Sequence, residues 1–206
     1  MRNSVGELFG GVDDARIKSA ISQYTTIRGA VIQFVETFDA LPGNFSEADQ
    51  VFGQDSPVGR GDGHISGAGL DAPHKSEAAA FWLHLSQAKM LSLPDIIAPD
   101  RPLRPNIHMP DSSFQYAAFS VKERPFGWKG VWLVLGAVNG SDTDGGAFTP
   151  LQAKKFLKIS GLRAPQSGNT RIANGRGLDT CLSHKDRLNF RSGERACTVY
   201  FRLWGG

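Results

Sequence analysis

The pattern of hydrophobic positions predicts one long helix near the start of the chain. Apolar residues recur there at alternating steps of three and four, the spacing that places side chains on one face of a helix. Pro42 disfavours helical geometry at Leu41, and Gly43 permits a left-handed turn, so the predicted helix covers 13–38. Such a long apolar face needs a broad cover, most simply a sheet. The face consists of Ile17, Ala20, Tyr24, Ile27, Val31, Phe34 and Phe38.

Two shorter helices are predicted from their capping residues. Ser76 is a good N-cap for a helix whose apolar face extends to Leu91 and which ends before Pro94. Thr149 and Gln152 have the spacing of a capping box, which predicts a helix over 150–159. A further short turn of helix is expected within 46–52.

Three segments have the composition of β-strands. They are rich in β-branched and aromatic residues, and they alternate or run apolar, at 114–121, 128–138 and 196–203. The polar stretch 139–146 and the Gly- and Arg-rich stretch 162–179 are predicted as loops.

These elements predict an α+β fold in a single domain. The chain has 206 residues, with enough apolar residues for one core. We expect a segment 1–12 that is disordered or truncated, followed by a domain 13–206. Within that domain, a helical spine 13–38 carries a globular head 39–206.

The charge is unevenly distributed along the chain. The net charge is +3, but the residues from Pro150 onward include 11 Lys and Arg against 3 Asp and Glu, a balance of +8. The residues before Pro150 include 12 against 17, a balance of −5. A basic end suits nucleic acid, an acidic partner or lipid headgroups, although most such ends are solvated faces.

The two cysteines, Cys181 and Cys197, leave two interpretations open. Their even count and short spacing fit one disulfide, which would contribute roughly 3 kcal/mol and suits an oxidising compartment. The alternative is a pair of buried free thiols. The sequence shows neither an evident signal peptide nor a run of 18 apolar residues.

The Gly-rich stretch 53–69 contains a fragment of a calcium-loop pattern. Asp62 and Gly63 match the middle of an EF-hand loop, but the first and third ligand positions fall on Val58 and Arg60. Asp55 and Asp62 are therefore only weak calcium candidates, and we favour a turn-rich loop without metal or cofactor.

Nothing in the sequence indicates an enzyme. It contains no nucleophile elbow, P-loop or zinc-protease motif. His74, Glu77 and His84 have side chains that bind metals, but two helical turns separate Glu77 from His84, too far for two ligands of one tetrahedral ion. We expect no catalytic residue.

The order of several short motifs resembles the type IV pilin-like proteins, especially the pseudopilins and prepilin-type proteins of type II secretion. The motifs are a Leu-Pro-Gly-x-Phe turn after the long helix, a Gly-x-Gly-Asp-Gly-x-Ile loop, and a Glu followed by Phe-Trp-x-His-Leu. They lie at 40–45, 59–65 and 77–85, and the pair Cys181 and Cys197 also fits the family. Such proteins usually begin with a leader and a hydrophobic half-helix, which this sequence does not show before Asp13.

The resemblance implies a structural subunit of a pilus or pseudopilus. It would act by assembly with other pilin or pseudopilin subunits in the periplasm or in an extracellular filament. The inner membrane would anchor it before assembly if an upstream hydrophobic segment exists. Two alternatives are an exported enzyme and a minor pilin that binds DNA, although we expect no useful nucleic-acid binding. Residues for contact with DNA or a partner would be Arg187, Arg191 and Arg195.

Overall fold

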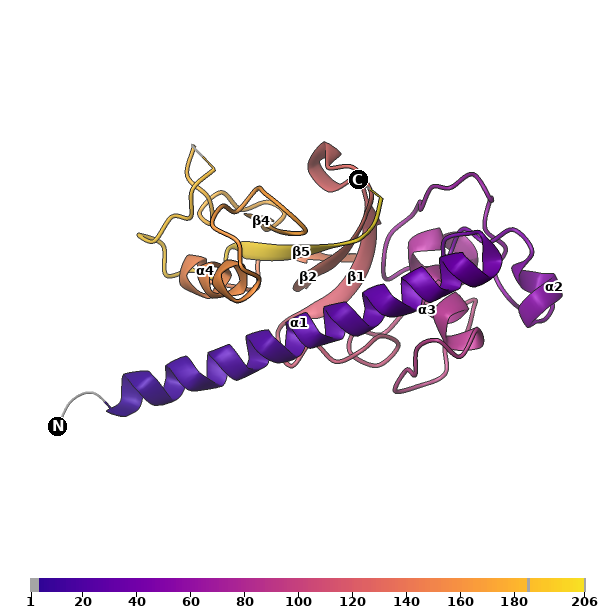
Figure 1. Cartoon of the computed structure of the whole chain (residues 1–206), viewed down its shortest axis with the longest axis horizontal. Helices are drawn as coiled ribbons and strands as arrows, with labels where there is room; N and C mark the ends of the chain where they lie inside the picture. Colours follow the sequence, from indigo (N-terminus) through magenta and orange to yellow (C-terminus); the bar gives the residue numbers. More distant parts are fainter. Residues whose placement is uncertain (1–3, 185, 206) are drawn as a thin grey trace.

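Helix α1, Ser4–Phe38, runs along the long axis of the molecule, and the rest of the chain lies against it (Figure 1). The computed structural model describes residues 4–184 and 186–205, with side chains from residue 13 onward. The fold is α+β, with a small antiparallel sheet packed on α1. Among the described residues, no helix is long and apolar enough to cross a membrane.

The predicted apolar face of α1 is the buried face. Five of its residues are buried, and Tyr24 and Phe38 are half-buried against the same core. The helix begins at Ser4, so the predicted start at Asp13 was too late. Each residue added to an existing helix gains a hydrogen bond without a new nucleation step, and no proline stops this extension. Residues 1–3 of the expected disordered or truncated segment lie outside the described residues.

The two helices with predicted caps begin where expected, and one of them ends earlier than expected. α4, Pro150–Ile159, has the predicted bounds and a complete capping box at Thr149. α3, Glu77–Gln87, begins after the predicted N-cap Ser76 but ends short of Pro94. Lys89 adopts a left-handed conformation with φ of 58°, which stops the helix early. The short helices are α2, Ala48–Phe52, and two 3-10 turns, Pro73–Lys75 and Pro125–Gly127.

The sheet has five strands that all pair antiparallel. Its order is β1-β2-β5-β4, and β3 pairs with the far end of β2. The strands are β1, Ala118–Glu123; β2, Val131–Asn139; β3, Asp142–Gly145; β4, Thr170–Asn174; and β5, Cys197–Trp204.

Two strands contradict the loops predicted from the sequence. β3 lies within 139–146 and β4 within 162–179. β3 is the return strand of a hairpin that turns at Gly140, where φ is 62°. β4 has only five residues with glycines on both sides, so its composition resembles a loop although it pairs with β5 along its length.

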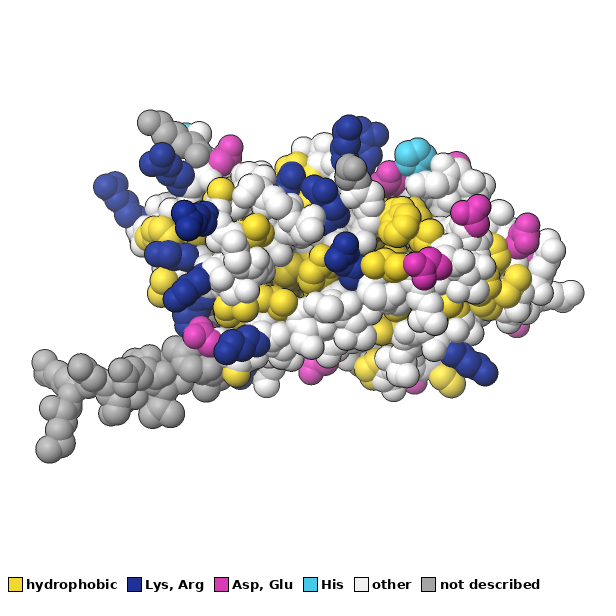
Figure 2. Space-filling view, in the orientation of Figure 1, with side chains coloured by type: hydrophobic (Ala, Val, Ile, Leu, Met, Phe, Trp, Pro, Cys, Tyr) yellow, Lys and Arg dark blue, Asp and Glu magenta, His cyan; other side chains and the backbone are white. Residues whose placement is uncertain are grey.

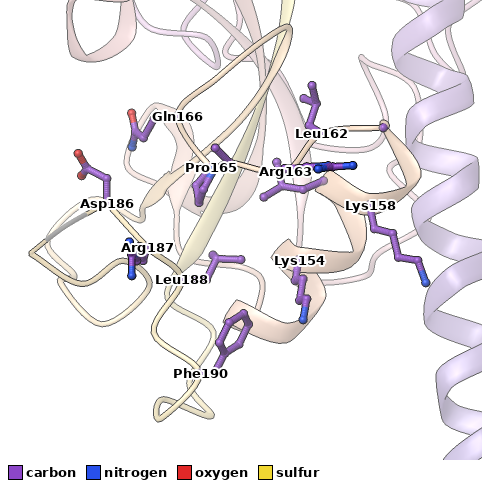
Figure 3. Close-up of a pocket in the computed structure, with 13 residues that line it drawn as sticks. Lys154, Lys158, Leu162, Arg163, Pro165, Gln166, Asp186, Arg187, Leu188 and Phe190 are labelled. Atoms are coloured by element: carbon purple, nitrogen blue, oxygen red, sulfur yellow. The ribbon is translucent and has the colours of Figure 1, made fainter.

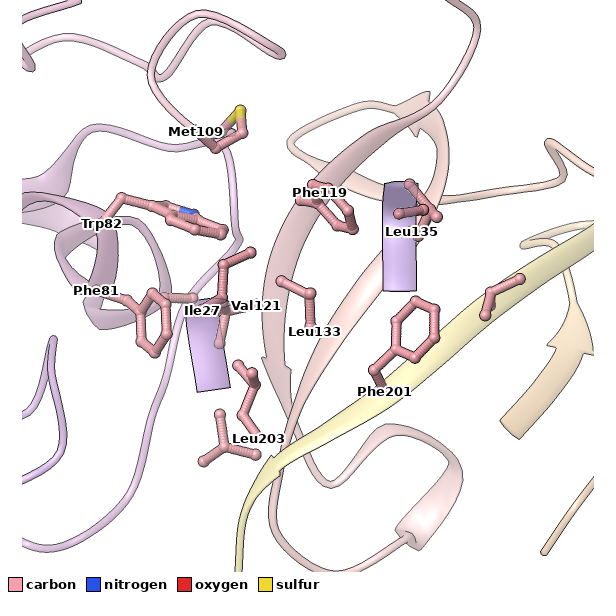
Figure 4. Packing of buried hydrophobic residues seen from close by; sticks show 14 of the residues in the cluster. Ile27, Phe81, Trp82, Met109, Phe119, Val121, Leu133, Leu135, Phe201 and Leu203 are labelled. Atoms are coloured by element: carbon pink, nitrogen blue, oxygen red, sulfur yellow. The ribbon is translucent and has the colours of Figure 1, made fainter. Parts of the chain in front are cut away.

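The core lies between α1, α3 and one face of the sheet (Figure 4). Alternate residues of the three long strands point into it, because side chains of a strand alternate between its two faces. Tyr24 on α1 stacks on Phe201 at 4.9 Å between ring centroids, and its hydroxyl donates a hydrogen bond to the Arg202 carbonyl. The inward residues of these strands include Phe119, Val121, Leu133, Leu135, Phe201 and Leu203.

A disulfide joins Cys181 to Cys197, so of the two interpretations the disulfide is the correct one. Both cysteines are fully buried, and their Cα atoms are 5.0 Å apart. The bond ties the loop after β4 to the first residue of β5.

Substitution of Phe34 by alanine tests the assignment of the α1 face. Phe34 is fully buried, so Phe34→Ala should lower the free energy of unfolding by about 3–5 kcal/mol. Arg28 is exposed and lies off the apolar face, and Arg28→Ala should change the free energy by less than about 0.5 kcal/mol. Urea denaturation measures both. Equal midpoints for the two variants would contradict the assigned face.

Candidate functional site

Glu77, in the first turn of α3, accepts hydrogen bonds from several residues of the loop between α1 and α3 and holds that loop in place. Its Oε1 accepts hydrogen bonds from the Asn44 side-chain amide at 2.8 Å and from the Arg60 backbone N–H at 2.9 Å. Its Oε2 accepts from the backbone N–H and the hydroxyl of Ser66, and from the Arg60 guanidinium at 3.1 Å. Burial by itself would raise the pKa of Glu77, but these hydrogen bonds hold it below its ordinary value.

His84, two turns further along α3, holds two other points of the same loop. The Gly43 backbone N–H donates to its Nδ1 at 2.9 Å. The opposite nitrogen therefore carries the proton, and Nε2 donates to the Pro57 carbonyl at 2.7 Å. The ring is fully buried and stacks near Phe34. Burial lowers the pKa of His84 to about 4, only partly offset by the bond to Pro57. His84 is thus a neutral structural residue at pH 7.

Neither calcium candidate lies in a cluster of acidic side chains from the described part of the chain. Asp55 is exposed and forms no ion pair with a described residue. Asp62 accepts hydrogen bonds from the Asn44 amide and the His64 backbone N–H, and the Arg60 guanidinium lies 3.5 Å from it. Arg60 therefore already supplies a positive charge between Asp62 and Glu77. Among the described residues, no group of three His, Cys, Asp or Glu side chains is arranged to hold a metal ion.

The sheet provides further acceptors for the Gly-rich loop. Glu123 on β1 accepts from the Ile65 backbone N–H at 2.6 Å and bonds the His64 ring at 2.8 Å. Asp142 on β3 accepts from the Gly69 backbone N–H at 2.9 Å. Sequence reasoning did not find these anchoring roles or that of Glu77. A long loop needs acceptors for its buried N–H groups, but no local pattern identifies distant carboxylates as those acceptors.

A second candidate site is an open groove between α4 and the loops that follow it (Figure 3). We call it the basic groove, and its volume is about 1080 Å³. The ammonium of Lys154 lies 5.2 Å from the ring centroid of Phe190. Among the described residues that line it, Asp186 is the one acidic residue. Its apolar lining is Leu157, Leu162, Pro165, Leu188 and Phe190, and its cations are Lys154, Lys158, Arg163 and Arg187.

The structure separates the three arginines that were expected to form a contact surface. Arg187 lines the basic groove, whereas Arg191 and Arg195 do not. The Arg195 guanidinium instead stacks on Tyr116, at 3.7 Å from the ring centroid. The sequence indicated the charge of this region, but it did not show that Lys154, Lys158 and Arg163 join Arg187 across the chain. These four cations come together because α4, the loop after it and the loop between Cys181 and Cys197 line the same groove.

The chemistry of the two sites differs. Glu77 and His84 have all their polar atoms bonded to the protein, so they hold the loop in place. The basic groove combines cations with an apolar floor, which suits a partner that is both acidic and apolar. Comparisons with protein-family models, curated proteins and solved structures found no match for this chain.

The buried His84 predicts a loss of stability in mild acid. Its pKa of about 4 in the folded protein lies below the ordinary 6.5, so the unfolded chain binds the additional proton. The stability is present above pH 6.5 and is lost as the pH falls from there towards 4. From pH 7.5 to 5 the free energy of unfolding should fall by about 2 kcal/mol. Urea titrations at both pH values measure this, and the His84→Gln variant should lose most of the difference. An equal pH dependence in the two proteins would contradict the assignment.

Calcium should have little effect on stability. Arg60 lies beside Asp62 and Glu77, and a divalent cation there would meet its positive charge. A ligand at 100 times its dissociation constant would add about 2.7 kcal/mol. Denaturation in millimolar calcium, with magnesium and a chelator as controls, should show no such increase. A calcium-specific rise that Asp62→Ala abolishes would identify Asp62 as a ligand.

Proposed function

We propose that this chain is a structural subunit of an extracytoplasmic pilus or type II secretion pseudopilus. The observation that carries this proposal is that α1 is longer than the sheet that packs on it. With 35 residues it spans about 52 Å, whereas the longest strand has nine residues and spans about 30 Å. Its N-terminal turns extend beyond the sheet and α4 (Figure 1).

A helix that extends beyond its own domain is suited to packing against other subunits. An isolated helix in water has little stability, because in proteins most of the stability of a helix comes from packing against other elements. The head covers one face of α1 only, and exposed residues lie off that face, among them Arg16, Lys18, Thr25 and Arg28. Neighbouring helices of an assembly would cover such an exposed face, as the proposed function requires.

The position of the resembling motifs also supports the proposal. The Leu-Pro-Gly turn, the Gly-rich loop and the α3 motif are three separate stretches, yet they form one interlocking unit. Gly43 donates to His84, and a Cβ at Gly43 would lie 2.1 Å from the Glu77 carbonyl oxygen. Asn44 donates to Glu77, and the Gly59 backbone N–H donates to the Phe45 carbonyl. Because the three motifs contact one another in the fold, their joint resemblance to the pilin-like proteins is harder to explain as three independent coincidences.

The proposal places the protein in an oxidising compartment. The buried disulfide suits the periplasm or the cell exterior. The partners would be other pilin or pseudopilin subunits, and an upstream hydrophobic segment, if one exists, would hold the subunit in the inner membrane before assembly.

Localisation in the native cell tests this function. Antibodies raised against the head should label surface filaments or membrane-associated assemblies by immunogold electron microscopy, and mechanical shearing should release labelled filaments. A photo-reactive residue at position Arg16 on the exposed side of α1 should cross-link to another helical subunit. The same group at Ile96, which is 89% exposed on the head, serves as the control.

Two results would contradict the proposal. One is a protein distributed through the cytoplasm with Cys181 and Cys197 as free thiols. The other is a protein that forms no cross-link from α1 under conditions in which the assembly is intact.

A further inference from the structure

We propose that the basic groove of one copy binds the acidic end of a second copy, so that subunits join head to tail. The acidic end is the surface formed by Glu36, Asp39, Glu47, Asp49, Val51, Asp55 and Val58, around the C-terminus of α1 and α2. This inference rests on the proposed function and adds to it a specific contact between heads.

The two surfaces lie at opposite ends of the molecule. α4, which forms one wall of the basic groove, lies towards the N-terminal half of α1, and α2 lies at the far end of the long axis (Figure 1). In the same orientation, Lys and Arg side chains gather at the first end, and most of the visible Asp and Glu side chains lie on the other half (Figure 2). The head is therefore an electrostatic dipole along the axis of α1.

Several charges at both ends form no ion pair with a described residue. Arg60, Lys122 and Arg104 all form ion pairs with carboxylates. In contrast, no ion pair within 4 Å joins a described residue to the groove cations Lys158, Arg163 and Arg187, nor to Glu47, Asp49 and Asp55 of the acidic end. Charges of opposite sign at the two ends are thus free to pair between copies.

Both surfaces also expose apolar side chains. Val51 on α2 is 50% exposed and Val58 is 53% exposed. Phe190, at the edge of the basic groove, is 57% exposed, and Leu162 and Leu188 contribute to its floor. Contact between such surfaces would bury apolar area, while the surrounding charges fix the orientation and exclude a contact between like ends.

The geometry of this contact leads to an open chain of subunits. The two surfaces are different patches on one molecule, so the contact is heterologous. Each copy that uses its acidic end still presents a free basic groove, and the contact repeats unless a rotation closes it into a ring. An extended repeat along the axis of α1 is the arrangement that a filament needs.

Charge reversal in two complementary variants tests the contact. The groove variant is Arg163→Glu with Arg187→Glu, and the acidic-end variant is Glu47→Lys with Asp55→Lys. Sedimentation velocity should show concentration-dependent association of the unmodified full chain that weakens as salt is added. Each variant alone should associate at least about tenfold more weakly. An equimolar mixture should recover association, because each variant then meets a surface of opposite charge.

A matched control separates this effect from net charge. The variant Arg101→Glu with Lys129→Glu makes the same change in net charge as the groove variant, but at two exposed positions outside both surfaces. It should associate like the unmodified chain. Circular dichroism and thermal unfolding should show that all variants fold.

Cysteine cross-linking detects the contact even where association is weak. Val51→Cys mixed with Lys158→Cys should give a disulfide-linked dimer under mild oxidation, whereas Val51→Cys mixed with Arg101→Cys should not. The native cysteines are fully buried, so the introduced thiols are the accessible ones.

The proposal is overturned if charge reversal leaves association unchanged, or if the mixture fails to recover it and the cross-link shows no preference. Binding to phosphatidylglycerol vesicles or short duplex DNA, lost in the groove variant without any self-association, would also overturn it and assign the groove to another anion. If the protein lies in filaments in cells but the mixed variants do not associate, the proposed contact between heads is wrong and the proposed filament role is unaffected. If the mixed variants associate but the cellular protein is not in an assembly, the filament role is wrong.

Discussion

The structure depends on one constraint, which is that α1 has a single apolar face. Ile17, Ile27, Val31 and Phe34 are fully buried, and the residues between them on the other side of the helix are exposed. A helix of this kind is covered by protein on one side only, so the sheet and α3 lie together on that side. Since the strands are shorter than the helix, the sheet covers only part of the length of α1, and the N-terminal turns extend past the sheet (Figure 1).

At the C-terminal end of α1, α3 determines how the following loop folds. Glu77 and His84 are both buried, but they hold the loop in different charge states. Glu77 is an anion that accepts bonds from N–H, O–H and guanidinium donors, and the neutral His84 accepts from one backbone group and donates to another. Together they fix the loop at positions from Gly43 to Ser66. A loop rich in glycine pays a high conformational entropy when it is ordered, and these two buried residues offset that cost with specific bonds.

The sequence predicted elements whose signals are local and failed where partners are distant. The α1 face and the α4 capping box depend on spacings of a few residues, so both could be recognised before the structure. β4 depends on a strand that follows more than twenty positions later, and its five residues are loop-like in composition. The Asn139-Gly140 dipeptide was a usable hairpin signal for β3 that the acidic residues around it obscured. The basic charge near the C-terminus was visible in the sequence, but its division between the basic groove and the Arg195–Tyr116 stack required the tertiary fold.

The disulfide has a role in the proposed contact as well as in stability. The described residues between Cys181 and Cys197 form no helix or strand, only the short pairing of Leu182 with Leu188. This loop carries Arg187, Leu188 and Phe190 to the basic groove. Binding to a loop that must first be ordered costs free energy, and a loop that is ordered beforehand avoids most of that cost. The Asn174 side-chain oxygen accepts the backbone N–H groups of Cys181 and Leu182, so the loop leaves the sheet at a fixed point. The cross-link fixes its return on β5, and the groove is therefore shaped before any partner arrives.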